Sequence, residues 1–171
     1  MTSSVTIDTP RFVLRSLTPA DATESYLSWF SDLSAQKYIE AASTTSRLTD
    51  LEDYIREKVA RDDVVFLGIF DRDSGAHIGN LKYEPVDEAA GTAVMGVLIG
   101  DPSFRGKGVT PEVLEASMQW LKQRRNVRTI ILGVSRENEQ AIRAYEKVGF
   151  SIQPPTAEHA AKNAHRMVLN F

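Results

Sequence analysis

The stretch GDPSFRGKGVTPEV, residues Gly100–Val113, has the least ordinary spacing of residues in this 171-residue chain. Gly106 and Gly108 flank a lysine, and a threonine and a proline follow. Glycines leave the backbone uncovered, so amide N–H groups here can approach a ligand closely. The residues that follow predict a helix, whose N-terminus offers free N–H groups and a partial positive charge. The loop therefore favours a phosphate or pyrophosphate, although a plain strand–helix turn also uses such glycines.

Two familiar phosphate-binding patterns fit this loop poorly. The P-loop pattern G-x-x-x-x-G-K-S/T fails twice, because Asp101 stands in the first glycine's place and Gly108 follows the Gly–Lys pair. The dinucleotide pattern G-x-G-x-x-G finds two glycines, but Pro111 holds the third place. The next predicted strand ends in Ser135, not in an acidic residue that could bind a ribose. On the loop alone, a nucleotide-phosphate protein of another kind stays open.

Hydrophobic patterning around the loop predicts one α/β domain over residues 1–171. Strands are predicted at residues 11–17, 64–70, 77–83, 92–100, 127–134 and 165–171. Helices are predicted from Thr18–Pro19, from a capping box at Thr49–Glu52 to about residue 62, over residues 111–125, and over 138–149. The strand at 127–134 has the apolar run of a strand buried on both faces. Three meandering strands followed by a strand–helix–strand crossover predict a mixed, mostly antiparallel sheet with helices on both faces.

Composition excludes several classes of protein. Apolar residues make up 42% and charged residues 25% of the chain, as in ordinary globular proteins, and the net charge of −3 argues against general nucleic-acid binding. With no cysteine and three widely spaced histidines, we expect neither a disulfide nor a metal site. No window approaches the roughly 20 apolar residues of a membrane helix, and the first twelve residues lack a long apolar run. We therefore expect no signal peptide, no membrane partner and a cytoplasmic location.

Two motifs together resemble a known family. The residues RGKGVT (Arg105–Thr110) resemble the R/Q-x-x-G-x-G/A signature of the GNAT superfamily of N-acetyltransferases. About thirty residues downstream, NEQAIRAYEKVGF (Asn138–Phe150) resembles its second landmark, N-x-x-A-x-x-x-Y-x-x-x-G-F. The phrases IGNLKY and GVLIGDPSFRGKG are most similar to the branch of ribosomal-protein N-terminal and amino-sugar acetyltransferases. The resemblance covers nearly the whole chain and implies a GNAT fold.

The resemblance also implies acetyl-CoA, or another acyl-CoA, as donor. The amides of the loop would cradle its pyrophosphate: Arg105, Gly106, Lys107, Gly108, Val109 and Thr110. The backbone of Val97, Leu98 and Ile99 would pair with the pantetheine arm as one strand pairs with another. Asn138 would hydrogen-bond the arm, and an asparagine at a helix start is equally typical of a cap. Thr110 departs from the usual Gly or Ala, and we expect it to cap the following helix through its hydroxyl.

Acyl transfer to an amine needs a neutral amine, a stabilised oxyanion and a proton for the departing thiolate. Helical spacing alone places Tyr145 on an apolar stripe, as a core residue. The resemblance implies instead that Tyr145 is the general acid, because it lies seven residues after Asn138 and four before Gly149. We expect a backbone N–H near Leu98 to hold the oxyanion.

The general base is less easily assigned. Relatives often carry a glutamate where this chain has Val94, and valine cannot accept a proton. Glu84, Asp87 and Glu88 are possible substitutes, although solvated hairpin charges explain them as well. A non-catalytic CoA-binding regulatory module is therefore an alternative to an N-acetyltransferase.

The acceptor side is the least specific part of the sequence. Trp29, Phe30, Tyr38 and Asn80 are candidates for acceptor binding, although aromatic residues on an amphipathic helix are also typical of a core. The small, polar segment at residues 41–48 could be a lid, and Lys82 is expected to point away from the core. An amino sugar, a peptide N-terminus and a small amine all stay open as acceptors. An exposed edge strand near the C-terminus suggests a homodimer.

Overall fold

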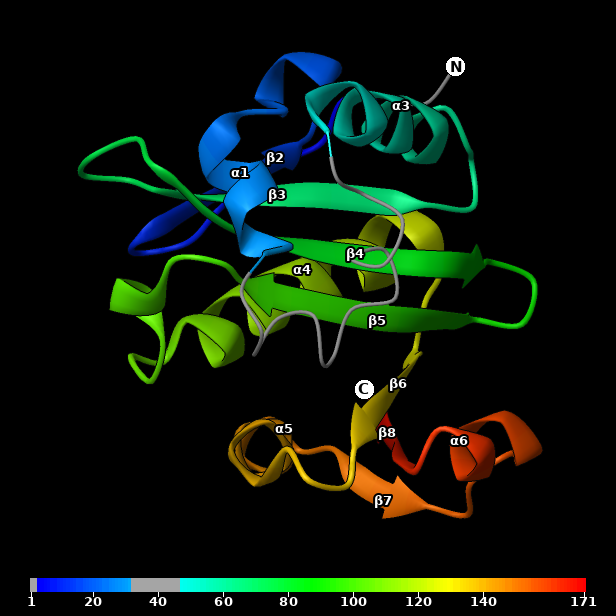
Figure 1. Ribbon diagram of the computed structural model, residues 1–171. Coiled ribbons are helices and arrows are strands. Elements are labelled where there is room, and N and C mark those ends of the chain that lie inside the picture. Colours follow the sequence, from blue (N-terminus) through cyan, green and yellow to red (C-terminus); the bar gives the residue numbers. More distant parts are fainter. Residues whose placement is uncertain (1–2, 32–46) are drawn as a thin grey trace.

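The computed structural model describes residues 3–31 and 47–171, which form one eight-stranded sheet with helices on both faces (Figure 1). The strands are β1 (Thr6–Asp8), β2 (Phe12–Ser16), β3 (Val65–Asp71), β4 (His77–Asp87), β5 (Thr92–Ile99), β6 (Thr129–Ser135), β7 (Ser151–Gln153) and β8 (Ala164–Asn170). Their order in the sheet is β1-β2-β3-β4-β5-β6-β8-β7. The β5–β6 pair is parallel and the other pairs are antiparallel. The predicted mixed, mostly antiparallel sheet is confirmed.

The helices divide between the two faces of this sheet. They are α1 (Glu24–Trp29), α3 (Leu48–Val59), α4 (Val109–Arg125), α5 (Glu139–Val148) and α6 (Ala157–Ala161), with 3-10 turns η1 (Pro19–Asp21) and η3 (Pro102–Phe104). Residues of α4 and α5 share one buried cluster with the sheet, and residues of α1 and α3 share a second cluster. No described helix is long and apolar enough to cross a membrane.

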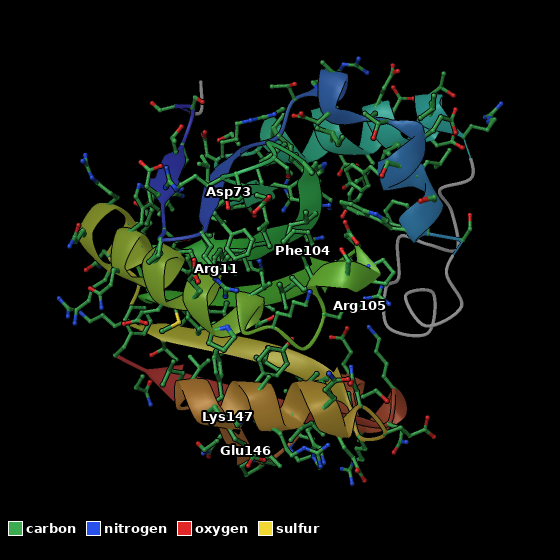
Figure 2. All side chains as sticks on the ribbon, turned by 90° about the vertical axis from the view of Figure 1, so that its left-hand side faces the viewer. Arg11, Asp73, Phe104, Arg105, Glu146 and Lys147 are labelled. Carbon is green, nitrogen blue, oxygen red and sulfur yellow. The ribbon has the colours of Figure 1, made fainter. Side chains whose placement is uncertain are left out.

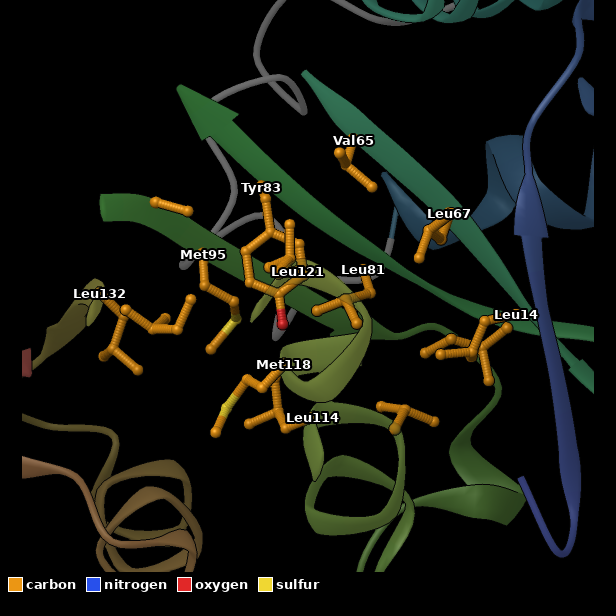
Figure 3. Packing of buried hydrophobic residues seen from close by; sticks show 14 of the residues in the cluster. Leu14, Val65, Leu67, Leu81, Tyr83, Met95, Leu114, Met118, Leu121 and Leu132 are labelled. Carbon is orange, nitrogen blue, oxygen red and sulfur yellow. The ribbon is translucent and has the colours of Figure 1, made fainter. Parts of the chain in front are cut away.

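The larger core lies between the sheet and α4. The stripe predicted from helical spacing is buried there: Val113, Leu114, Met118 and Leu121. Tyr83 of β4 reaches across the core to α4, and its hydroxyl lies 2.8 Å from Ser117 Oγ (Figure 3). This bond satisfies two buried hydroxyl groups that would otherwise destabilise the core.

The smaller core lies under α1 and α3. Leu51 and Ile55 of α3 are fully buried, and Trp29 of α1 packs against Gly100 at the end of β5. A Cβ atom on Gly100 would lie 2.0 Å from the Trp29 ring, so glycine is required for this contact. Trp29 thereby fixes α1 to the strand that leads into the glycine-rich loop.

Several helix starts differ from the prediction. Thr18 begins only the 3-10 turn η1, and α1 begins separately after Thr23, whose hydroxyl accepts a hydrogen bond from the Tyr26 N–H at 3.1 Å. The capping box predicted at Thr49–Glu52 is wrong, because α3 already begins at Leu48 and Arg47 is its N-cap residue. Helix α4 begins at Val109, so the expectation that Thr110 caps it is also wrong.

Strand β6 is buried on one face only. Ile130, Leu132 and Val134 are buried, whereas Gly133 is exposed, so the predicted burial of both faces is wrong. The exposed face of β6 is only partly covered, by His159 of α6 beside Gly133. The edge strand β7 presents Ile152 with 47% of its surface exposed, and a homodimer through this edge stays a prediction.

His77 should make the stability of this fold depend on pH. Its ring stacks on Phe70 at 4.7 Å and bonds Asn80 at 2.7 Å, and burial outweighs this bond and the nearby Asp21, so its pKa lies below the usual value. The His77 ring therefore binds a proton more readily in the unfolded chain than in the folded protein. The neutral His77 ring stabilises the fold fully above about pH 6.5, and this stabilisation is lost as the pH falls. We expect the free energy of unfolding to fall as the pH drops below about 6.5, and His77→Gln to flatten that slope in urea titrations. An unchanged slope would contradict the assignment.

Candidate active site

The centre of the sheet contains a seam where two parallel strands separate. Strands β5 and β6 pair only over Thr92–Val94. Beyond Val94, β5 continues along β4 as far as Ile99, and β6 continues along β8 as far as Ser135. Figure 1 shows β6 turning away from β5 over this stretch. The last residues of β5 therefore have a paired side toward β4 and an unpaired side toward β6.

The alternation of backbone groups along β5 shows which residues face this seam. The Gly100 N–H donates to the Ile78 carbonyl of the β4 side at 2.9 Å. Successive residues of an antiparallel strand face opposite sides, so Leu98 also faces β4 while Val97 and Ile99 face the seam. The Leu98 N–H expected to hold an oxyanion points the wrong way, and the Val97 N–H is the seam-facing alternative.

The glycine-rich loop follows directly at the end of β5. Arg105, the first residue predicted to bind pyrophosphate through its amide, already makes hydrogen bonds within the protein. Its N–H donates to the Pro102 carbonyl at 3.2 Å, and its Nε donates to the Ile99 carbonyl at 2.9 Å. Arg105 thus braces the loop against β5, and its amide is not available for a phosphate. In the part of the chain that the structure describes, no group accepts a hydrogen bond from the amides of residues 106–110.

Positive φ angles give the loop its shape. Gly106 has a φ of 70° and Gly108, the N-cap of α4, a φ of 75°. Side chains rarely adopt this region, so both glycines are required by the backbone itself. The free amides therefore gather at the N-terminus of a 17-residue helix, where the helix dipole adds to their attraction for an anion.

The second sequence landmark lies next to this loop in space. Gln140 in the first turn of α5 places its Nε2 atom 3.9 Å from where a Cβ on Gly106 would be. Asn138 is the N-cap of α5, and its Oδ1 accepts from the Ala141 N–H at 3.3 Å. The cap is thus confirmed for Asn138, and its amide nitrogen has no partner among the described residues. Figure 2 shows α5 running beside α4, with Arg105 near the start of α4.

Tyr145 combines a buried ring with an accessible hydroxyl. Its side chain is only 8% exposed and packs against Phe150 with ring centroids 5.9 Å apart. The hydroxyl makes no hydrogen bond to a described residue, yet no enclosed polar side-chain atom in the described chain lacks a partner, so the hydroxyl oxygen must reach solvent. Burial raises the pKa of Tyr145 to about 12. The group is therefore protonated at neutral pH and free to donate.

Three of the residues predicted to bind an acceptor are almost fully buried. Trp29 and Phe30 are each 5% exposed and pack around Tyr26, and Asn80 is bonded to His77. Tyr38 and most of the proposed lid at residues 41–48 lie outside the described residues. On the same face of the sheet Val94 is 37% exposed, and no described atom lies within 4 Å of a Cβ built on Gly96. Among the described residues, Val94 and Gly96 are therefore accessible on this face.

An ion-pair cluster flanks this accessible patch. The Glu84 carboxylate forms ion pairs with Lys58 Nζ at 2.7 Å, Arg61 Nη1 at 2.6 Å and Lys82 Nζ at 3.1 Å. Lys82 Nζ also donates to the Tyr54 hydroxyl at 2.9 Å. Partial burial works to raise the pKa of Glu84, but the bonds from Lys58 and Lys82 outweigh it and the pKa lies below its usual range. Glu84 is thus a partly buried member of β4 and a poor proton acceptor, not a solvated hairpin charge.

Two hollows lie on the described surface. One of about 330 Å³ lies at the end of β5, beside Trp29, His77 and Gly100. Another, of about 770 Å³, lies between Val59 and Trp120, and Glu88, one of the possible substitute bases, lines it. Among the described residues, no cluster of three metal-ligating side chains is present.

Comparison with known proteins decides the family. Residues 11–151 match the sequence family described as "Acetyltransferase (GNAT) domain". The chain belongs to the GNAT acetyltransferase family. The match spans β2 to β7, so it contains both the glycine-rich loop and the Tyr145 helix.

Solved GNAT structures share this fold at low sequence identity. RimL, an α-N-protein acetyltransferase of a ribosomal protein, superimposes with a TM-score of 0.84 at 14% identity, over 99% of this chain and 96% of that chain. A spermidine N-acetyltransferase from Vibrio cholerae, in complex with CoA and spermine, has a TM-score of 0.79 at 18% identity, over 94% and 95%. The self-immunity acetyltransferase MccE, in complex with acetyl-CoA and AMP, has a TM-score of 0.80 at 13% identity, over 95% and 93%. The GNAT fold is therefore confirmed over nearly the whole chain.

Proposed function

We propose that this GNAT chain transfers the acetyl group of acetyl-CoA to a primary amine. The observation that carries the proposal is the set of unpaired amides at residues 106–110, which opens onto the seam beside β5. A pyrophosphate on these amides would place the pantetheine arm along the seam side of Val97 and Ile99, where the Ile99 carbonyl already accepts from Arg105. Structural relatives in complex with CoA or acetyl-CoA support this donor.

The residues around the seam suggest how the transfer proceeds. The amine nitrogen attacks the thioester carbon, the Val97 N–H stabilises the oxyanion, and the carbon–sulfur bond then breaks. Tyr145 donates its proton, or a strong hydrogen bond, to the departing thiolate, since its hydroxyl is protonated and has no competing partner. Glu84, the candidate base on β4, is held by three cations, so we propose that water removes the proton of the amine.

The acceptor approaches, in this proposal, over Val94 and Gly96. Lys82 is the neighbour of Gly96 on β4, and it lies with Lys58 and Arg61 around the carboxylate of Glu84. Arg61 also pairs with Asp63 and Lys58 with Glu57, so the cations and carboxylates of this cluster balance. We therefore propose a primary amine as acceptor without preferring a peptide N-terminus, an amino sugar or a small amine.

Two measurements test the proposal. Calorimetry should show saturable binding of acetyl-CoA, and an acceptor screen that detects free thiol should show turnover with a peptide or an amino sugar. Absence of acetyl-CoA binding would refute the donor site. Tight CoA binding without turnover of any amine would instead support a regulatory module.

A further inference from the structure

We infer that Arg11 is a positioning residue of the donor site, through which the turn between β1 and β2 holds the glycine-rich loop ready for pyrophosphate. The inference rests on the proposed use of that loop for acetyl-CoA. It assigns a role to a segment about 90 residues before the loop, outside both sequence landmarks.

Arg11 spans the junction between the loop and its helix. Its Nη1 donates to the Lys107 carbonyl at 3.0 Å, and its Nε donates to Glu112 Oε1 at 2.7 Å. Its backbone N–H donates to the other oxygen of Glu112 at 2.9 Å. Lys107 lies between the two positive-φ glycines and Glu112 lies in the first turn of α4. One side chain therefore fixes the orientation of the loop relative to the helix.

The charge of Arg11 matters for an anion at this place. Glu112 is a carboxylate near the amides proposed to bind phosphate, and Thr9 Oγ1 also donates to it at 2.6 Å. Partial burial works to raise the pKa of Glu112, but the bonds from Thr9 and Arg11 lower it below the usual range. The carboxylate is therefore ionised, and without Arg11 its charge would repel a phosphate.

One nitrogen of the Arg11 guanidinium makes no hydrogen bond to the described residues. Its Nη2 has no hydrogen-bond partner among the described residues and lies 3.7 Å from where a Cβ on Gly108 would be. The guanidinium is thus held by two of its nitrogens while the third faces the N-cap of α4. A guanidinium group held in this way by Nε and Nη1 can still donate to an anion through Nη2.

The turn that carries Arg11 is itself held in place. Arg72 of the β3–β4 hairpin donates through Nη2 to the Thr9 carbonyl at 2.8 Å, and its N–H donates to the Arg11 carbonyl at 2.9 Å. On the other side, Phe12 meets Phe104 of η3 edge to face with centroids 6.1 Å apart. Figure 2 shows Arg11 and Phe104 between the N-terminal strands and the start of α4. The turn is therefore a fixed support for the loop.

The test compares donors with and without a pyrophosphate. The variants are Arg11→Gln, Arg11→Lys and the control Arg56→Gln, which removes an exposed arginine paired with Asp53 on α3. We expect Arg11→Gln to weaken CoA binding about tenfold by calorimetry and to raise the KM for acetyl-CoA by a similar factor, with kcat unchanged. Turnover of S-acetyl-pantetheine, which lacks the pyrophosphate, should not change. Arg11→Lys should lie between, since it keeps the charge but loses the fork.

The outcomes separate this inference from the function on which it rests. Wild-type protein that failed to bind CoA would overturn both. Wild-type binding with an unchanged Arg11→Gln affinity, or an equal loss with both donors, would overturn the role of Arg11 alone. Thermal melts of each variant check folding, and if Arg11→Gln does not fold, the same comparison is decided by Arg11→Lys.

Discussion

Replacing Tyr145 with phenylalanine should lower kcat for acetyl-CoA about 100-fold while leaving its KM nearly unchanged. The ring would keep its contact with Phe150, so the helix and the seam would keep their packing. Only the proton available to the departing thiolate would be lost. Steady-state kinetics with a confirmed acceptor would measure the effect.

Tyr83→Phe is the matched control for this substitution. The Tyr83 hydroxyl is bonded to Ser117 in the core, so its removal should cost about 1 kcal/mol of stability without an effect on kcat. The Tyr145 hydroxyl has no partner among the described residues, so Tyr145→Phe should change kcat without an effect on stability. Full turnover by Tyr145→Phe would refute the acid role. Because burial holds the pKa of Tyr145 at about 12, its ionisation should not limit kcat below about pH 10.

Replacing Gly79 with alanine should lower the free energy of unfolding by about 3 kcal/mol, near the upper end for an overpacked core. A Cβ at this position would lie 2.3 Å from the Leu98 carbonyl oxygen and 3.2 Å from the Ile99 Cα. Both atoms belong to the backbone of β5, so no side chain can rotate away from the clash. The strands would have to separate beside the seam, and donor binding should weaken as well.

Gly96→Ala provides the comparison within the same pair of strands. No described atom lies within 4 Å of a Cβ at Gly96, so this substitution should change stability by less than about 0.5 kcal/mol. Urea denaturation without ligand would measure both variants. Equal stability of the two variants would show that β4 and β5 can separate at little cost.

Local patterns predicted the parts of the protein whose signals are local. The apolar stripe of α4 and the Asn138 cap each depend on residues within one or two turns. The alternating strands of the meander are likewise short-range patterns. Strands β1 and β7 escaped prediction because three residues carry no measurable period. Helix starts shifted where neighbouring residues could cap equally well, as at Arg47 and Thr49.

The site was less predictable because it depends on contacts between distant residues. Trp29 is buried against Gly100, 71 positions away in the sequence. The α1 sequence alone does not show whether the Trp29 ring is buried or exposed. The Arg11–Glu112 pair joins residues 101 positions apart. The hydrogen bond from Arg105 to the Ile99 carbonyl of β5 likewise lies in an irregular loop, where hydrophobic periodicity gives no prediction. The one sequence feature that points to Arg11 is Glu112, a negative charge in the first turn of a helix expected to bind phosphate. Such a charge calls for a cationic partner, and Arg11 supplies it.

The separation of β5 from β6 gives this protein an edge inside its sheet. Outer edges expose hydrogen-bonding groups to any passing strand, and proteins usually keep them short for that reason. Here the inner edge lies between two long strands, where another protein chain would have to enter end-on. In the proposed mechanism, the pantetheine arm would complete the ladder at Val97 and leave again after each turnover. The donor substrate would then supply hydrogen-bonding groups that the resting sheet lacks at this inner edge.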